Sequence, residues 1–304
     1  MPEPKEGEVV VKATFISVDP YMRGRMTAAK SYVAGFEIDK PLAGGVAGIV
    51  VDSKADSLQK GDAVVGFMGW AKYQAVPAKS LRKVDAKTIP MEKHLSSAQY
   101  SGLSSWLPIK YIGMPKKGEV AFVNAAAGAV GSCACQLLQI QGLTVVGCAG
   151  SPEKIKWLEG LGIKAFNYKD GKFKDLLKKH CPNGIDVAFD NVGGEQMEAI
   201  LENMNNFGRV ICCGMISQYN LKPEDMYGVK NMFHIIKKRL KLQGFIMTDF
   251  SAEQKGEAVK ELVAWISQKK LITTETVVEG FEKIPEAFAG LFTGKNLGKM
   301  LVKV

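Results

Sequence analysis

The alternation of apolar runs with small or polar residues is clearest between residues 119 and 141. An apolar run, Val120–Val123, has the length and composition of a buried parallel strand. Small residues occupy 124–131, and apolar side chains then recur at helical spacing, at Val130, Ala134 and Leu137. The pattern predicts a strand, a tight turn and a helix in direct succession.

The same alternation continues toward the C-terminus. Ser251 and Gln254 form a capping box that opens a helix running to about residue 270. Other helical patterns fall at 152–161, 173–180 and 195–203, and strand patterns at 120–123, 144–148, 165–168, 186–190, 209–213 and 242–247. Strands joined in this way by crossover helices make a doubly wound parallel sheet, so we predict an α/β fold.

The chain on either side of this region has a different character. Residues 8–18 alternate like a half-exposed antiparallel strand, and further strand patterns at 46–51 and 63–67 are separated by glycine-rich turns. The pattern becomes helical over 96–111. After the long helix come a strand at 275–278, a helix at 285–292 and a strand at 299–304. We therefore predict a partly closed β-barrel formed by residues 1–97 with 271–304, and a doubly wound domain formed by 98–270.

The turn after the strand Val120–Val123 matches a dinucleotide-binding fingerprint. Ala126 takes the place of the first glycine, and Gly128 and Gly131 the places of the second and third. Gly128 would let the backbone approach a pyrophosphate, and Gly131 would let the helix pack against the strand. The free N–H groups of the helix would then face the phosphates. A tight turn in another kind of α/β protein is the alternative that the motif alone leaves open.

The end of the next predicted strand distinguishes NADP from NAD. An NAD-binding protein places an acidic residue about 20 residues beyond the motif, on the ribose hydroxyls. This chain has Ala149, Gly150 and Ser151 there, with Lys154 one helical turn later. Because no carboxylate repels a 2′-phosphate, while a hydroxyl and an ammonium can bind one, NADP(H) is the expected cofactor.

Composition and charge exclude several other functions. The chain of 304 residues has a formal charge of +9, spread without interleaved aromatic residues apart from a basic cluster at 237–241, so nucleic-acid binding is not expected. His94, His180 and His234 form no metal-ligand spacing with a cysteine, and no metal is expected. The cysteines fall mostly in predicted core elements, as reduced thiols do. Since we find neither a signal peptide nor an apolar run near the roughly 20 residues of a membrane span, we expect a cytoplasmic protein.

Six motifs, in order along the chain, resemble those of one family. They are SVDPYMRGRM (17–26), AAAGAVG (125–131), DNVGG (190–194), CGMISQYN (213–220), LQGFI (242–246) and NLGK (296–299). The chain is similar to the zinc-independent branch of the medium-chain dehydrogenase/reductases, which includes prostaglandin, alkenal and curcumin reductases. The resemblance implies a GroES-like catalytic domain, a Rossmann domain, and NADPH-dependent reduction of the carbon–carbon double bond of α,β-unsaturated aldehydes or ketones by hydride transfer to the β-carbon. It is also compatible with a homodimer.

The resemblance implies a set of cofactor-binding residues as well. The glycine turn would hold the pyrophosphate, Lys154 and Tyr168 the 2′-phosphate side, the loop 213–219 the groove, and Asn296 the nicotinamide end. The full set, with Ser151 added from the charge argument, is Gly128, Ala129, Val130, Gly131, Ser151, Lys154, Tyr168, Asn191, Cys213, Gly214, Met215, Ile216, Ser217, Tyr219, Phe245, Ile246, Met247 and Asn296. Tyr168 as a core aromatic, and Asn191 and Asn296 as turn residues, are the structural alternatives.

For reduction of a conjugated carbonyl, the protein needs mainly to hold the reactants together and to donate a hydrogen bond to the enolate oxygen. We expect Tyr21 to be this donor or to relay a proton, the alternative being a packing residue in a turn. Arg23 and Arg25 are expected to be structural, paired with carboxylates or carbonyls.

Three features depart from the family pattern. Family members usually carry further residues ahead of the segment that opens this chain, so the first strands of the catalytic domain are expected to be missing, unless the numbering began late. Residues 99–102 replace the usual GMPG, and Lys237 replaces a tyrosine near the nicotinamide ribose. Two other functions stay open on this fold: an NADPH:quinone oxidoreductase, and an NADPH-binding protein without turnover.

Overall fold

The computed structural model describes residues 1–27 and 31–304. The chain divides into two compact units: unit 1 comprises Met1–Tyr100 and Thr273–Val304, and unit 2 comprises Ser101–Ile272. Unit 2 is therefore an insertion between the two parts of unit 1. The domain limits expected from the sequence fall within a few residues of these divisions.

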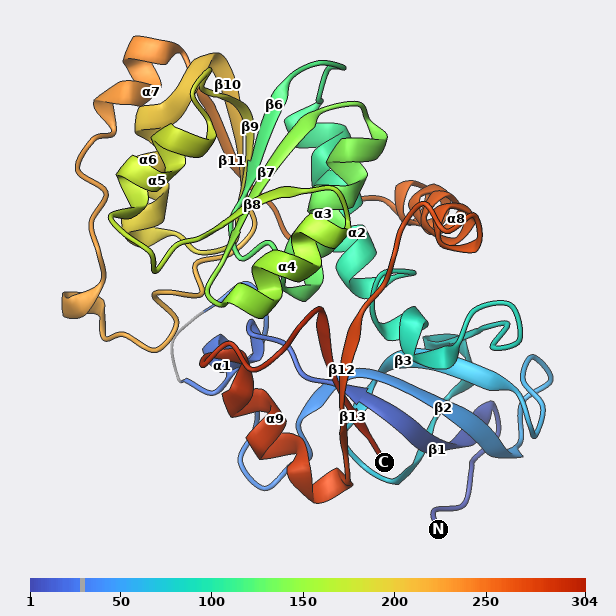
Figure 1. Ribbon diagram of the computed structural model, residues 1–304. Helices are drawn as coiled ribbons and strands as arrows, with labels where there is room; N and C mark the ends of the chain where they lie inside the picture. The colour runs from blue at the N-terminus through green and yellow to red at the C-terminus, as the bar shows by residue number, and fades with distance from the viewer. Residues whose placement is uncertain (28–30) are drawn as a thin grey trace. The chain divides into compact units, whose positions relative to one another are not determined.

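In the described part of unit 1, seven strands form one mixed sheet. They are β1 (Glu8–Ser17), β2 (Ala43–Ser53), β3 (Ala63–Gly69), β4 (Tyr73–Pro77), β5 (Leu81–Lys83), β12 (Glu275–Glu279) and β13 (Lys299–Lys303). β1 pairs antiparallel with β2, β4 and β13, whereas β12 pairs parallel with β13. The last strand thus joins the first, and both termini belong to this unit (Figure 1).

Both faces of this sheet are buried. Along β3, Val64 belongs to one apolar core and Val65 to another, as the alternation of side chains across a strand requires. The first core is completed by Ile284 and Ala287 of α9 (Ile284–Leu291), and the second by Leu95. The shorter helices of the unit are α1 (Met22–Arg25), η1 (Ala78–Ser80), η2 (Met91–Leu95) and η6 (Phe281–Lys283).

In unit 2, the described strands form a six-stranded parallel sheet in the order β11-β10-β9-β6-β7-β8. Their bounds are β6 (Val120–Val123), β7 (Thr144–Ala149), β8 (Lys164–Asn167), β9 (Ile185–Asp190), β10 (Met204–Cys212) and β11 (Lys241–Gly244). The chain runs outward from β6 through β7 to β8, and then from β9 on the other side of β6. Ligands of doubly wound sheets bind beyond the carboxyl ends of the strands at such a switch point.

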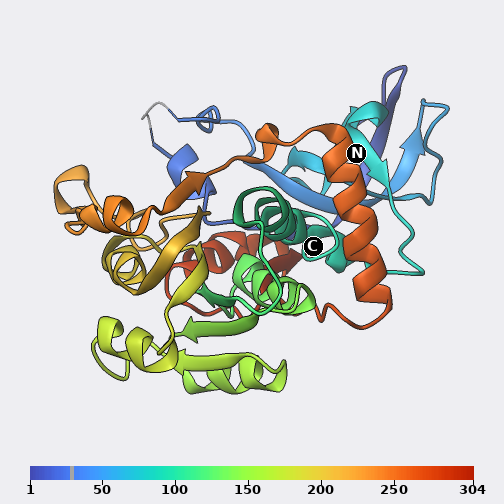
Figure 2. The same ribbon diagram turned by 90° about the horizontal axis from the view of Figure 1, so that it is seen from above.

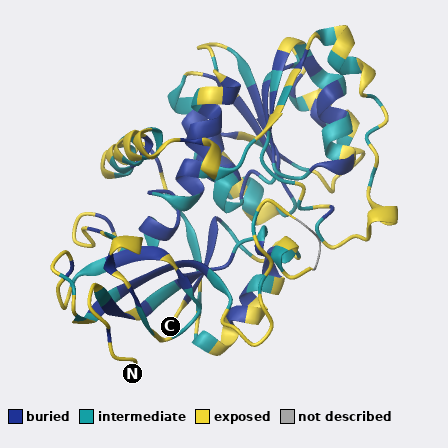
Figure 3. Cartoon of the chain, turned by 180° about the vertical axis from the view of Figure 1, so that it is seen from behind, coloured by how far each residue is buried: buried dark blue, intermediate teal, exposed yellow. Residues whose placement is uncertain are grey.

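Helices cover both faces of the parallel sheet. α3 (Ala129–Ile140) and α4 (Pro152–Gly160) lie on one side, and α5 (Phe173–His180) and α6 (Gly194–Asn203) on the other (Figure 1). The strands between them are buried (Figure 3), which explains why β6 is a continuous apolar run. The remaining helices are α2 (Tyr100–Pro108), the π-helix η3 (Ile109–Gly113), η4 (Pro223–Asp225), α7 (Phe233–Lys238), η5 (Met247–Asp249) and α8 (Ala252–Ser267).

α8 is a long regular helix (Figure 2) that begins at the expected capping box. The side chain of Ser251 accepts from the N–H of Gln254 at 3.1 Å, and the side chain of Gln254 accepts from the N–H of Ser251 at 2.8 Å. None of the described helices is long and apolar enough to span a membrane.

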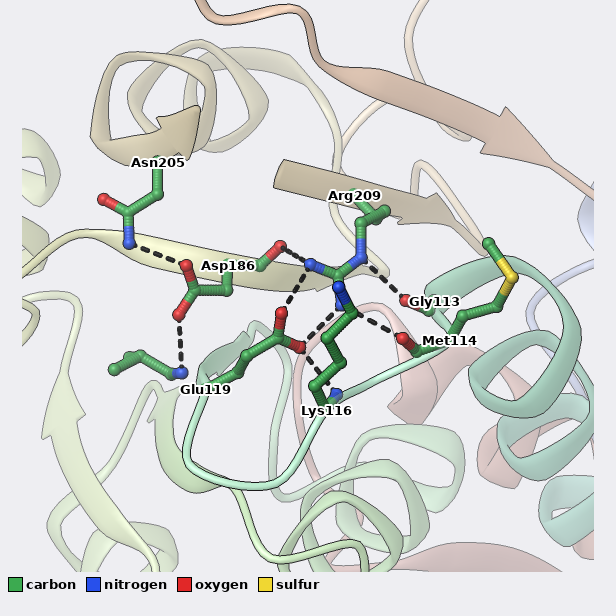
Figure 4. A network of polar contacts seen from close by, with 8 residues as sticks. Gly113, Met114, Lys116, Glu119, Asp186, Asn205 and Arg209 are labelled. Carbon is green, nitrogen blue, oxygen red and sulfur yellow. Dashed lines mark hydrogen bonds and ion pairs between the residues drawn. The ribbon is translucent and has the colours of Figure 1, made fainter. Parts of the chain in front are cut away.

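An ion pair fastens the amino ends of the strands in unit 2. Arg209 of β10 donates to both carboxylate oxygens of Glu119, at 2.9 and 2.6 Å, and to the carbonyl oxygens of Gly113 and Met114 (Figure 4). Planar pairing of this kind fixes orientation as well as distance. It joins β10 to the segment that enters β6.

The predicted fold class is confirmed, with local differences. Strand β11 ends at Gly244 instead of continuing to Met247, because the N–H of Ile246 turns to the carboxylate of Asp249 at 2.8 Å. Strand β10 begins at Met204, ahead of the expected residue 209, and passes through a positive φ of 62° at Phe207. The short strands β4 and β5 and the helix α7 were not predicted.

His94 makes the stability of unit 1 depend on pH. It is 5% exposed, and its pKa is lowered from the ordinary 6.5 by burial and then by the charge of Arg82. Below pH 6.5, His94 binds a proton more readily in the unfolded chain than in the folded one. The free energy of unfolding therefore falls as the pH falls through this range.

We expect the free energy of unfolding, measured with denaturant, to fall less between about pH 7 and pH 5.5 in His94→Gln than in the wild type. His180→Gln, on a less buried histidine, is the control, and equal losses in wild type and His94→Gln would contradict the assignment.

Candidate cofactor and active site

The expected cofactor-binding residues of unit 2 follow the carboxyl ends of its strands. Because parallel strands all end at the same edge of a sheet, these segments form one rim. The turn 124–131 follows β6, Ser151 and Lys154 follow β7, Tyr168 follows β8, Asn191 follows β9, the loop 213–219 follows β10, and Phe245, Ile246 and Met247 follow β11.

The glycine turn brings the start of α3 close to the end of β6. A Cβ on Gly131 would lie 2.3 Å from the carbonyl oxygen of Ala125, so a larger residue would push the helix away. A Cβ on Gly128 would meet only that oxygen, at 3.2 Å, a tight contact but a much smaller overlap than at Gly131. Gly128 is the N-cap of α3, and no side chain caps this 12-residue helix. The first N–H groups of α3 are therefore placed to bind an anion, which fits a pyrophosphate.

The ends of β7 and β8 gather positive charge. Burial lowers the pKa of Lys154, the charge of Glu153 raises it, and the smaller effect of Lys169 lowers it. A bound dianion such as a 2′-phosphate would stabilise the ammonium form of Lys154. Lys169 was not anticipated. It directly follows Tyr168, and a basic residue next to the end of a strand is the signal that could have found it.

Ser151 and Tyr168 are held in place by their local contacts. Ser151 is the N-cap of α4, and its hydroxyl accepts from the N–H of Lys154 at 3.4 Å. The ring of Tyr168 packs over Gly150, where a Cβ would lie 2.7 Å from the phenolic oxygen. Glycine at position 150 therefore lets the tyrosine lie against the end of β7, and the ammonium of Lys169 lies 5.9 Å from the centre of its ring.

Two loops on the other side of the switch point are joined by their backbones. The carbonyl of Asn191 accepts from the N–H of Ile216 at 3.1 Å, and the carbonyl of Val192 accepts from the hydroxyl of Ser217 at 2.7 Å. The hydroxyl of Tyr219 accepts from the N–H of Met215 at 3.1 Å, which closes the second loop on itself. The structure thus brings together the expected residues 191 and 213–219.

The thiol of Cys213 lies within this pair of loops. Burial, and then the charge of Asp190, raise its pKa to about 12. The group is therefore a neutral thiol near neutral pH and offers no thiolate nucleophile.

Tyr21 and Asn296 belong to unit 1. Tyr21 follows the turn at Asp19 and Pro20, and burial, and then the charge of Asp19, raise its pKa above the ordinary value. The phenol therefore stays protonated and can donate a hydrogen bond. The side chain of Asn296 donates to the carbonyl of Gly298 at 2.8 Å, just before β13.

A buried lysine ties these two segments together. Lys299 is 3% exposed, and its ammonium donates to the carbonyl of Val18 at 3.0 Å and to the carboxylate of Asp19. The hydroxyl of Ser17 donates to the other oxygen of that carboxylate. This arrangement fixes the turn that carries Tyr21. It was not predicted, although Lys299 belongs to the motif NLGK.

Arg25 has the structural role expected for it. Its guanidinium donates to the carbonyls of Ala34 and Ala43, at 2.9 and 3.3 Å, and packs over the ring of Phe36 at 4.0 Å.

The chain matches two family models and several known proteins. The model described as the N-terminal domain of oxidoreductase matches residues 1–84, and the zinc-binding dehydrogenase model matches residues 129–268. The chain is 46% identical to YfmJ of Bacillus subtilis (strain 168) over an alignment of 308 positions that covers 100% of this chain and 90% of the relative. It belongs to the medium-chain dehydrogenase/reductase family.

Other members place it in the branch of the prostaglandin, alkenal and curcumin reductases. It is 39% identical to the NADP(+)-dependent 2-alkenal reductase of Nicotiana tabacum over 98% of this chain and 87% of that protein. Prostaglandin reductase 1 of Rattus norvegicus is also 39% identical, over 100% and 91%. The crystal structure of CurA from Vibrio vulnificus in complex with NADPH has a TM-score of 0.94 and 34% identity, covering 100% of this chain and 92% of that chain.

The medium-chain family also contains enzymes that bind zinc. Within residues 1–27 and 31–304, no group of three or more His, Cys, Asp or Glu side chains is arranged to hold a metal ion.

Gly128 and Gly131 have separable roles. Gly131→Ala forces α3 away from Ala125 and should lower the melting temperature, because its Cβ collides with backbone. Gly128→Ala should lower the melting temperature less than Gly131→Ala, because its Cβ stands 3.2 Å and not 2.3 Å from the oxygen of Ala125. It should bind NADPH more weakly, since its Cβ occupies the approach to the helix N-terminus. Thermal unfolding and fluorescence titration of each variant measure the two effects. If Gly128→Ala binds NADPH as tightly as the wild type, the pyrophosphate does not lie there.

Lys154→Ala tests the 2′-phosphate site. Loss of a charge-assisted contact should weaken NADPH binding by about 1–3 kcal/mol, while NADH binding stays nearly unchanged. Calorimetric titration with both nucleotides measures this, and Lys156→Ala, on the same helix, is the control. Equal losses for the two nucleotides would contradict the assignment.

Proposed function

We propose that this protein uses NADPH to reduce the carbon–carbon double bond of α,β-unsaturated aldehydes and ketones. The observation that carries the proposal is the rim of unit 2, where the uncapped helix α3 and the lysine pair 154 and 169 offer one site for a pyrophosphate and one for a 2′-phosphate. The relatives named for 2-alkenal reduction, and the CurA structure with NADPH, support the same reading.

The chemistry divides between the cofactor and the protein. When bound, the reduced nicotinamide supplies a hydride for the β-carbon of the conjugated carbonyl. The residues of the rim hold the dinucleotide: the N–H groups at the start of α3 bind the pyrophosphate, and Lys154 binds the 2′-phosphate. Phe245, Ile246 and Met247 are proposed for the nicotinamide end.

Tyr21 is proposed as the group that acts on the substrate. As the β-carbon gains hydride, negative charge develops on the carbonyl oxygen, and the α-carbon then takes a proton. A phenol whose pKa is raised keeps its hydrogen and can donate it in a hydrogen bond to the enolate oxygen. The buried ion pair Lys299–Asp19 holds the turn that presents this hydroxyl.

Two other activities give different results in the same assay. A quinone oxidoreductase of Escherichia coli bound to NADPH shares the fold, with a TM-score of 0.81, but at 21% identity it indicates the fold alone. An NADPH-binding protein without turnover is the other candidate. NADPH consumption with a 2-alkenal, a conjugated ketone and a benzoquinone separates them, because only the proposed activity consumes NADPH fastest with the first two.

The homodimer and the cytoplasmic location expected from the sequence stay predictions. The substrate class proposed here is a small conjugated carbonyl compound.

Tyr21→Phe should slow turnover of the alkenal without weakening NADPH binding. Loss of one donor to a developing oxyanion typically costs about 10²-fold or more in kcat. Steady-state kinetics and a nucleotide titration measure the two quantities. Tyr100→Phe removes another phenol of unit 1 whose pKa burial raises to about 12, and it serves as the matched control. An unchanged kcat in Tyr21→Phe would remove the residue from the mechanism.

A further inference from the structure

A buried carboxylate lies at the switch point of the parallel sheet, and the chemistry above does not use it. Asp190 ends β9 and is 1% exposed, and Asn124 directly follows β6 and is fully buried. The side-chain amide of Asn124 donates to the carboxylate of Asp190. The two strands that flank the expected cofactor crevice are thus joined by one side-chain pair at their carboxyl ends.

The carboxylate also fixes the loop that follows it. It accepts from the N–H of Val192 at 3.1 Å and from the N–H of Gly193 at 3.1 and 3.2 Å. Gly193 and Gly194 have positive φ angles of 68° and 57°, a conformation that residues with a side chain rarely adopt. The charge-assisted bonds therefore stabilise an unusual turn directly at the rim.

Asn124 holds the same loop from its other end. Its side-chain oxygen accepts from the N–H of Asn191 at 2.6 Å, and its backbone carbonyl accepts from the side chain of Asn191 at 3.0 Å. Every hydrogen bond of this amide thus serves the loop or the aspartate. The expected cofactor residue Asn191 is oriented by a neighbour that the sequence did not single out.

The second loop, residues 213–219, is hydrogen-bonded to the backbone of the same aspartate. The backbone carbonyl of Asp190 accepts from the N–H of Cys213 at 2.8 Å and from the N–H of Gly214 at 3.2 Å. Both loops on this side of the switch point are therefore hydrogen-bonded to one residue. A buried carboxylate is costly, as the raised pKa of Asp190 reflects, and the hydrogen bonds from Asn124, Val192 and Gly193 offset part of that cost.

We infer that Asp190 and Asn124 are positioning residues for the nicotinamide half of the cofactor site, acting through the loops 190–194 and 213–219. The inference rests on the proposed NADPH-dependent function. It differs from the role of Lys154 in a measurable way. Because the pair acts on the half that NADPH and NADH have in common, its loss weakens both nucleotides by the same factor, whereas loss of Lys154 weakens NADPH alone.

A reciprocal exchange of the two side chains tests the inference. Asp190→Asn places two amides against each other, and Asn124→Asp places two carboxylates against each other. Each single variant should raise the dissociation constants of NADPH and NADH together, by about tenfold or more. The double variant restores one amide, one carboxylate and the same donors, and it should return both constants close to the wild-type values.

Unit 2 offers a matched control at the other end of β9. Asp186 accepts from the side chain of Asn205 at 2.8 Å and from the N–H of Val120 at 2.9 Å (Figure 4). This pair has the same chemistry on the same strand, but it lies at the amino edge, away from the rim. Asp186→Asn and Asn205→Asp should cost stability and leave both dissociation constants unchanged.

Hydrogen exchange gives a readout that does not depend on the cofactor. In the folded single variants, the amides of Val192, Gly193 and Cys213 should exchange faster than in the wild type, and the double variant should protect them again. If a single variant does not fold, Ser217→Ala replaces it. This change removes the bond from Ser217 to Val192, between the same two loops, and should raise both dissociation constants equally.

The outcomes separate the two proposals. A wild-type protein that binds no NADPH would overturn the proposed function, and the exchange rates would still decide whether the pair fixes the loops. Wild-type binding together with unchanged constants in the folded single variants would overturn the inference. So would a folded double variant that recovers neither protection nor affinity, or control variants that weaken binding as much as the exchanged pair.

Discussion

The contact between Gly131 and the carbonyl of Ala125 sets the position of α3, on which the rest of the cofactor site depends. A Cβ there would stand 2.3 Å from that oxygen, so only a glycine allows the helix to begin directly above the end of β6. The N–H groups of its first turn then point out of the sheet without a side chain to satisfy them. An anion can therefore bind without any charged residue in the turn. The charged residues are placed at the next two strands instead.

The charged side chains on the two sides of the switch point differ in sign and in what they contact. The positive charges of Lys154 and Lys169 repel each other, so a bound phosphate would stabilise this side of the site. Asp190 instead accepts hydrogen bonds from Asn124, Val192 and Gly193, so its carboxylate is already held by groups of the protein. One side thus offers positive charge to a phosphate, and the other uses a hydrogen-bonded carboxylate to hold its loops.

The sequence predicted what depends on local patterns and missed what depends on distant residues meeting. The succession of β6, turn and α3, and the capping box at Ser251, were predictable because each is written within a few consecutive residues. Two contacts join residues that are far apart in the chain: Lys299 with Asp19, and Asn124 with Asp190. No rule of sequence spacing predicts them. The strand expected to reach Met247 ends earlier for a related reason. Its apolar residues suit a strand, but the backbone N–H of Ile246 donates to the carboxylate of Asp249 instead of to a neighbouring strand.

The pairing of β13 with β1 has a consequence for how the molecule is made. Phe15 is in register with Lys303, so β1 can pair with β13 only after residues 299–303 have been synthesised. Unit 2 lies between them in the sequence and can form on the ribosome while β1 still lacks this neighbour. Such an edge invites pairing with other nascent chains. Pairing of β13 therefore covers an edge of β1 that could otherwise pair with other chains. Loss of residues 299–303 would leave this edge open and would favour aggregation of unit 1.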